Sequence, residues 1–210
     1  MRPDPFSCAP WTVATYMIEG GSSRDRAKAR GLAFEDPVRV DGLLDVLVDA
    51  TVRYLAMQAR SGADVLKLFD SWTDGLPEDE FERLVIGPHR RIVEGLRRLG
   101  ITTPVIGFAR GAGALLENYA ERSGVSAAAL DVQASAELGR RVQRNMPIQG
   151  ALDPLLLRAG GERLRRRVDQ MLQDWGKGPY IFNLGHGVVL DTPVAHVAQL
   201  VEQVTSAGGE

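Results

Sequence analysis

Four side chains in the sequence could bind or protonate a ligand, and each lies beside a glycine-rich or strand-like segment. A phenol and a serine hydroxyl donate hydrogen bonds, a guanidinium binds carboxylates through two parallel N–H groups, and an imidazole moves protons near neutral pH. The guanidinium and the imidazole could each bind a carboxylate. The four residues are Tyr16, Ser71, Arg110 and His186.

Each of these residues also has a plain structural interpretation. Tyr16 lies in a helical turn and could be a core tyrosine, while Ser71 could form a loop cap with Asp70. Arg110 could be a solvated arginine beside a glycine turn. His186 stands between two glycines, which let a ligand approach the backbone closely, yet a lone histidine is usually structural. No GxSxG or GxGxxG pattern occurs, so neither a serine nucleophile nor a nucleotide loop is favoured.

The composition limits the ligands and the compartment. The chain has 210 residues, 44% hydrophobic and 25% charged, with a formal net charge of −2 and a pI near 6.0. It therefore has no bulk positive field for nucleic acid or an anionic membrane. No apolar run reaches the roughly 18 residues of a membrane span, and no signal peptide is evident, so we expect a cytoplasmic protein.

Cysteine and histidine usage argues against metal and disulfides. Cys8 is the only cysteine, which excludes an internal disulfide. The three histidines are scattered, without the HxH or HExxH spacing of zinc sites. The sequence predicts no metal.

Helical segments alternate with short apolar runs along the whole chain, with no linker between them. This pattern predicts one α/β domain, residues 1–210, with a parallel sheet covered by helices. Ser71, Arg110 and His186 fall in strand-to-helix loops, where both open sheets and barrels bind ligands. The expected strands are 64–69, 104–111, 127–131, 146–150 and 180–184; the expected helices are 41–60, 88–99, 115–122, 134–144, 163–175 and 193–204.

Five motifs in this order resemble the uroporphyrinogen decarboxylase family. They are APWTVATYMIEGGSS, GADVLKLFDSW, FARGAG, QGALDP and IFNLGHGVVLDTP, and they span nearly the whole chain. The resemblance implies a (β/α)8 barrel, a homodimer and no cofactor. It also implies a small-molecule substrate, uroporphyrinogen, from which the enzyme removes four acetate carboxyl groups to give coproporphyrinogen.

The resemblance assigns Tyr16, Ser71 and His186 to the family's substrate site. Arg110 stands where the family has a lysine and is a further candidate for binding the substrate. Ala151 stands where the family has an asparagine.

Part of the family pattern has no counterpart in the chain. The family's RQAGRY-type arginine motif and the aspartate that holds the pyrrole nitrogens are both absent, so no catalytic residue is assigned. We therefore expect the C-terminal portion of a barrel, with about five parallel strands and few cations at the strand ends. MRPDP would stand in place of a full strand. The partner would be a second copy of the chain or a complementing N-terminal part.

Two other functions remain open at this point. One is a corrinoid-dependent methyltransferase of the same superfamily, whose members usually bind zinc through histidine and cysteine. The other is a non-catalytic partial barrel that pairs with another chain through an exposed face.

Overall fold

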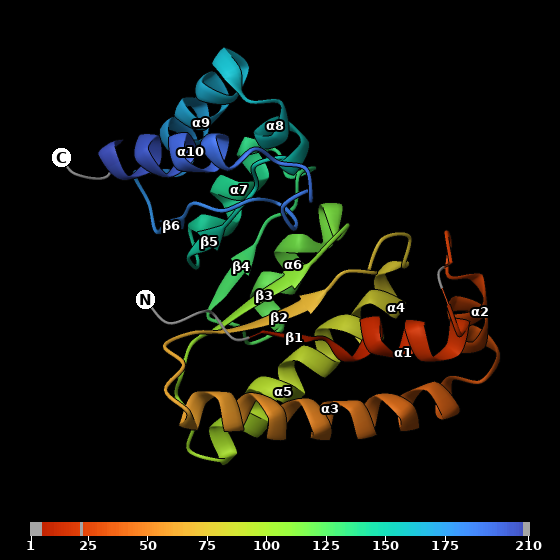
Figure 1. Ribbon diagram of the computed structural model, residues 1–210. Helices are drawn as coiled ribbons and strands as arrows, with labels where there is room; N and C mark the ends of the chain where they lie inside the picture. Colours follow the sequence, from red (N-terminus) through yellow and green to blue (C-terminus); the bar gives the residue numbers. More distant parts are fainter. Residues whose placement is uncertain (1–5, 22, 208–210) are drawn as a thin grey trace. The chain divides into compact units, whose positions relative to one another are not determined.

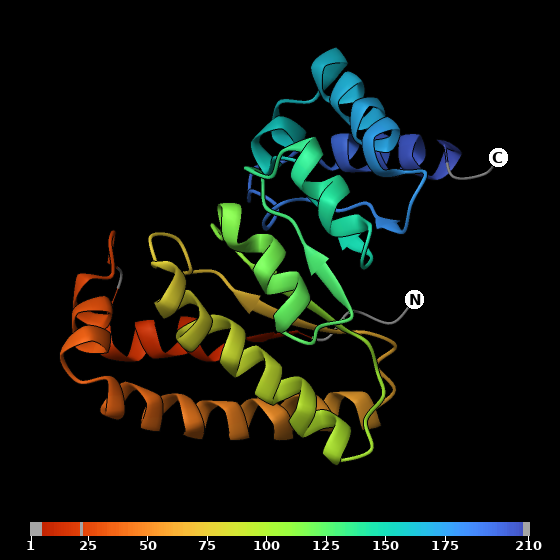
Figure 2. The ribbon, with the colours of Figure 1, turned by 180° about the vertical axis from the view of Figure 1, so that it is seen from behind.

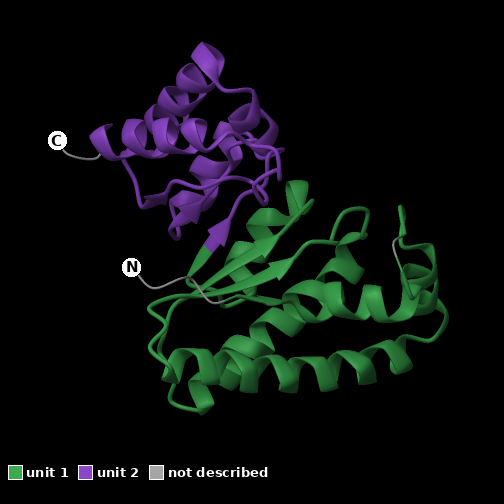
Figure 3. Cartoon of the chain, viewed as in Figure 1, with its two compact units in different colours: residues 1–127 green, residues 128–210 purple. Residues whose placement is uncertain are grey.

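The computed structural model describes residues 6–21 and 23–207, which form an α/β fold of parallel strands alternating with helices (Figure 1). The chain divides into two compact units, Met1–Ala127 and Ala128–Glu210 (Figure 3). Residues 1–5, which include the MRPDP segment, and Ser22 lie outside the described residues. Within the described residues, no helix is long and apolar enough to cross a membrane.

Unit 1 contains three parallel strands that are neighbours in chain order, β1, β2 and β3. Helices connect them, and Figure 2 shows α5 and α6 on the near side of these strands. The elements are β1 Phe6–Cys8, α1 Pro10–Glu19, α2 Ala27–Glu35, α3 Pro37–Arg60, β2 Leu66–Asp70, α4 Glu78–Phe81, the π-helical turn Glu82–Ile86, α5 Gly87–Arg98, β3 Val105–Ala109, the 3-10 turn Gly113–Leu115 and α6 Leu116–Arg122.

Unit 2 repeats the same alternation with shorter strands. Strand β5 pairs in parallel with β4 on one side and β6 on the other. The elements are β4 Ala127–Ala129, which begins at the unit boundary, α7 Ala136–Gln143, β5 Ile148–Gln149, α8 Pro154–Ala159, α9 Gly161–Trp175, β6 Tyr180–Ile181 and α10 Val194–Ala207.

The structure confirms the five expected strands and adds β1, which the sequence analysis did not predict. It also adds the helices α2 and α4, and it extends the helical turn expected around Tyr16 into the ten residues of α1. Strand β1 has only three residues, too few for a visible period-two pattern. Helix α2 has an even mixture of small, basic and apolar residues, so its sequence shows no distinct apolar face.

The core of unit 1 forms around β2 and β3. Leu66 and Leu68 of β2 are fully buried, whereas every residue of β3 is buried. Gly107 in β3 leaves the space that the Tyr119 hydroxyl occupies, because a Cβ at this position would lie 1.9 Å from that oxygen and 2.8 Å from Val125 Cγ1. Glycine is therefore required here by packing.

We expect Gly107→Ala to lower the free energy of unfolding by about 1–3 kcal/mol, the usual cost of overpacking a core. Gly42→Ala is the matched control, since Gly42 is exposed within α3 and a Cβ there meets no atom within 4 Å. It should be neutral or stabilise by up to about 1 kcal/mol. Urea titrations followed by circular dichroism measure both variants; an unchanged midpoint for Gly107→Ala would contradict the packing argument.

Candidate functional site

The carboxylate of Asp70 connects the end of β2 to the start of α1. Its Oδ1 accepts a hydrogen bond from the Thr12 backbone N–H at 3.0 Å and from the Thr12 hydroxyl at 2.6 Å. Ala9, the residue that precedes α1, has no side chain able to cap it, and Asp70 is fully buried. A carboxylate from another element therefore provides the N-terminal cap of α1.

The same threonine positions the candidate residue Ser71. The backbone N–H of Ser71 donates to Thr12 Oγ1 at 2.8 Å, so Asp70, Thr12 and Ser71 form one continuous set of hydrogen bonds. Tyr16 lies one turn further along α1 and is 51% exposed, so it is not a core tyrosine. Asp70 thus fixes the positions of both Ser71 and the helix that carries Tyr16.

The indole of Trp72 brings Tyr16 and Arg110 together. The Tyr16 ring contacts it edge to face, with centroids 6.1 Å apart, and the Arg110 guanidinium lies 5.8 Å from the ring centre. The backbone of Trp72 is fixed by a hydrogen bond, since the buried Trp11 donates its Nε1–H to the Trp72 carbonyl at 2.9 Å. Three of the four predicted residues therefore lie together at the carboxyl ends of β2 and β3. Ser71 begins the loop after β2, and Tyr16 and Arg110 lie beside that loop.

Two further arginines lie around this loop, and the sequence analysis missed both. Arg26 lies 4.2 Å from the Trp72 ring centre and pairs with Asp74 at 3.0 Å. Arg30 donates to the Gly75 carbonyl at 2.7 Å. The expectation that few cations lie at the strand ends was therefore wrong. These cations come from α2 and the residue before it, which had no recognisable sequence signal.

Behind the loop, Asp70 faces two buried titratable groups. Its Oδ2 lies 3.3 Å from His89 Nε2, and His89 Nδ1 hydrogen-bonds the Tyr119 hydroxyl at 2.8 Å. All three side chains are fully buried, so His89 belongs to the core of unit 1. Burial, with the nearby Asp70 charge second, raises the pKa of Tyr119 well above its ordinary value.

His186 lies in unit 2, in the exposed loop after the parallel bridge between Leu152 and Leu184. A Cβ on Gly185 would lie 2.7 Å from the Val132 backbone nitrogen, so this glycine is explained by close contact between two backbone segments. A Cβ on Gly187 would meet no atom within 4 Å. The assignment of His186 to a substrate site remains a prediction.

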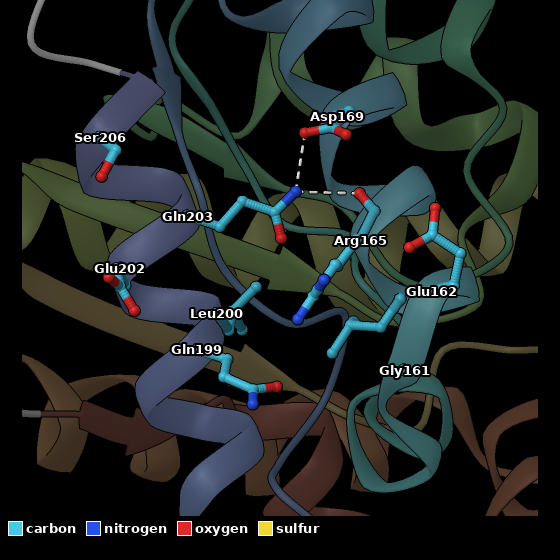
Figure 4. Close-up of a pocket in the computed structure, with 10 residues that line it drawn as sticks. Gly161, Glu162, Arg165, Asp169, Gln199, Leu200, Glu202, Gln203 and Ser206 are labelled. Carbon is cyan, nitrogen blue, oxygen red and sulfur yellow. Dashed lines mark hydrogen bonds between the residues drawn. The ribbon is translucent and has the colours of Figure 1, made fainter.

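A groove of about 410 Å³ in unit 2 lies between α9 and α10 (Figure 4). The Gln203 side chain crosses it and donates to the Arg165 carbonyl at 3.0 Å and to Asp169 Oδ1 at 2.7 Å. None of the four predicted residues lines this groove. The Gln203 amide, the polar group that crosses the groove, therefore links α10 to α9.

Comparison with known proteins identifies the family. A sequence model described as "Uroporphyrinogen decarboxylase (URO-D)" matches residues 5–207. The chain belongs to the uroporphyrinogen decarboxylase family. It is 61% identical over 200 residues to the uroporphyrinogen decarboxylase of Caulobacter vibrioides NA1000, covering 95% of this chain and 57% of that protein. The corresponding protein of Phenylobacterium zucineum is 59% identical over 201 residues, covering 95% of this chain and 58% of that protein.

A solved structure with the same fold is a methyltransferase from Methanosarcina mazei. It superposes with a TM-score of 0.78 at 17% identity, covering 97% of this chain and 58% of that one. At this identity the likeness concerns the fold alone: part of a (β/α)8 barrel, as the motifs predicted. The chain spans less than three fifths of the length of the curated decarboxylases it matches.

Thr12→Val should lower the free energy of unfolding by about 1–3 kcal/mol, because Asp70 loses a donor and the Ser71 N–H loses its acceptor in a water-poor site. Thr205→Val is the matched control, since that exposed hydroxyl bonds only to carbonyls of its own helix. It should change stability by less than about 0.5 kcal/mol. Equal effects in urea titrations of the two variants would refute the role given to Thr12.

Stability should fall at alkaline pH because the folded state holds the Tyr119 proton more tightly than the unfolded state does. This contribution is complete below the unfolded pKa of about 10 and is lost as pH rises toward the folded pKa, by up to about 1.4 kcal/mol per pH unit. Tyr119→Phe should reduce this slope between pH 9 and 11. Tyr54→Phe, which removes the same hydroxyl from a half-exposed ring, is the control; a slope unchanged by Tyr119→Phe would contradict the assignment.

Proposed function

We propose that this chain carries out uroporphyrinogen decarboxylase chemistry, converting uroporphyrinogen III to coproporphyrinogen III. The observation that carries the proposal is the 61% identity to a uroporphyrinogen decarboxylase over 95% of the chain. The loop that gathers Tyr16, Ser71 and Arg110 at the carboxyl ends of β2 and β3 supports it, because barrels place their chemistry at that end of the strands.

The reaction requires charge binding and proton transfer. In each step the bond between an acetate methylene and its carboxylate breaks, and carbon dioxide leaves. The electron pair flows into a pyrrole ring that has been protonated, and the methylene then takes up a proton to become a methyl group. The ring finally loses its added proton, so each step consumes one proton overall. The protein must bind the anion, supply the proton and stabilise the cationic ring.

We assign substrate-binding roles to the residues that the motifs indicated. Arg110 would bind a carboxylate through charge-assisted hydrogen bonds. The Tyr16 phenol and the Ser71 hydroxyl would donate further hydrogen bonds at the same loop. His186 would bind a carboxylate as well, and no residue of the chain is assigned as the proton donor.

We further propose that the protein works in the cytoplasm without a cofactor. Its partner would be a second copy of the chain or a chain that supplies the N-terminal part of the barrel. The low cysteine content and the absence of a bulk positive field support a reducing compartment and a small-molecule substrate.

The direct test is anaerobic incubation of the purified chain with uroporphyrinogen III, followed by separation of the products by carboxyl number. We expect seven- to four-carboxyl porphyrinogens, and Tyr16→Phe and Ser71→Ala should raise KM several-fold. Tyr54→Phe, at another exposed ring of unit 1, should leave KM unchanged. No product from a sample with native circular dichroism would reject the proposal for this chain.

A further inference from the structure

Three arginines surround the loop that follows β2, and together they form a cationic site on a chain with a net negative charge. We define the arginine cluster as Arg26, Arg30 and Arg110 around the loop Ser71–Gly75. We propose that this cluster is a binding subsite for the acidic side chains of a polycarboxylate substrate. The proposal rests on the function proposed above and adds Arg26 and Arg30 to the residues that the motifs indicated.

Arg110 is the member best placed to contact a ligand. Its backbone is fixed, since its N–H donates to the Asp70 carbonyl at 2.9 Å and its carbonyl accepts from the Thr73 hydroxyl at 2.7 Å. Its guanidinium, by contrast, has no hydrogen bond or ion pair with any residue in the described part of the chain; its recorded contact is with Trp72. A partly exposed cation on a rigid backbone, with its donors unused, suits an anionic ligand.

Arg26 and Arg30 bring additional positive charge to the same loop. Arg26 is 7% exposed and packs on the Trp72 ring, while Arg30 is bound to the loop backbone. The Nε atoms of both are buried and without a hydrogen-bond partner among the residues the structure describes. These Nε atoms are enclosed by the protein, so the contribution of the two side chains to the loop is their positive charge.

The charge balance at the loop favours an anion. Among the residues that the structure describes, one carboxylate, Asp74, forms an ion pair with the three guanidinium groups, and its side chain is 58% exposed. Trp72 contacts two of the guanidinium groups through its ring, an arrangement that orders the cations while leaving N–H edges for a ligand. Planar guanidinium groups match carboxylates in geometry, so acidic side chains are the chemistry that this cluster recognises.

The test is binding of uroporphyrin, the stable oxidised form of the proposed substrate, to the chain and to its Arg26→Gln, Arg30→Gln and Arg110→Gln variants. Affinity is measured by quenching of tryptophan fluorescence. We expect Arg110→Gln to bind about 10- to 100-fold more weakly, the loss typical of hydrogen bonds to a charged group. Arg26→Gln and Arg30→Gln should each bind several-fold more weakly.

Arg91→Gln is the matched control, because it removes one arginine charge and an ion pair with Asp45 from the α3–α5 surface of the same unit. It should bind like the wild type. A porphyrin with cationic substituents in place of carboxylates separates charge recognition from stacking, and its binding should not depend on the arginine cluster. Uroporphyrin binding within two-fold of wild type for all three cluster variants would overturn the proposal, as would no binding by the wild type.

Asp74→Asn should change the affinity for uroporphyrin in the opposite direction to the arginine variants. A variant that failed to fold could not show such a gain in affinity. Removing the competing carboxylate should tighten uroporphyrin binding, by up to about five-fold for a charge this exposed. A loss of affinity as large as that of Arg26→Gln would mean that the Arg26–Asp74 pair only holds the loop in shape, and would overturn the role of Arg26 as a binding group.

Binding and turnover can fail separately. Arginine-dependent binding without decarboxylation would support the subsite and reject the proposed function for this chain. Decarboxylation with KM unchanged in the three cluster variants would support the proposed function and reject the subsite.

Discussion

The carboxylate of Asp70 is the constraint on which the candidate site depends. It is a fully buried anion at the end of β2, a position that is costly unless hydrogen-bond donors surround the charge. One oxygen accepts from both the backbone and the hydroxyl of Thr12, and the other faces His89. Thr12 belongs to α1 and His89 to α5, so one buried carboxylate lies against two helices at the end of the strand. The loop that follows Asp70 therefore starts from a rigid point.

The site divides into a rigid framework and groups left for a ligand. Thr12 uses its hydrogen-bonding capacity on Asp70 and Ser71, and Trp11 uses its indole N–H on the Trp72 carbonyl. These bonds leave the Arg110 guanidinium and the Tyr16 phenol at a loop whose backbone is already ordered. Pre-organised groups of this kind lose less conformational entropy when a ligand binds.

The sequence was most informative where local chemistry alone decides the structure. An aspartate followed by a proline is a local signal for the start of a helix, and the structure has Asp153 accepting from the Leu155 N–H at 2.8 Å where α8 begins. The strands with long apolar runs were found for the same reason. Helix α2 was missed because its helical state depends on packing against α1 and α3, and its sequence has no strong apolar periodicity. The cap of α1 by Asp70 joins residues 58 positions apart, so no local pattern could indicate it.

The arginine cluster shows why net charge is a poor guide to what a protein binds. A chain of net charge −2 offers no long-range attraction to a polyanion, yet short-range contacts depend on a few charges within several ångströms. Arg26 and Arg30 lie 80 or more positions before Arg110 in the chain, and only folding brings the three to the same loop. The Trp72 ring adds a further condition, because it orders two guanidinium groups without neutralising them. Recognition of an acidic substrate at this loop therefore depends on an aromatic contact that holds like charges close together. In the described part of the chain, Asp74 is the carboxylate that pairs with the cluster.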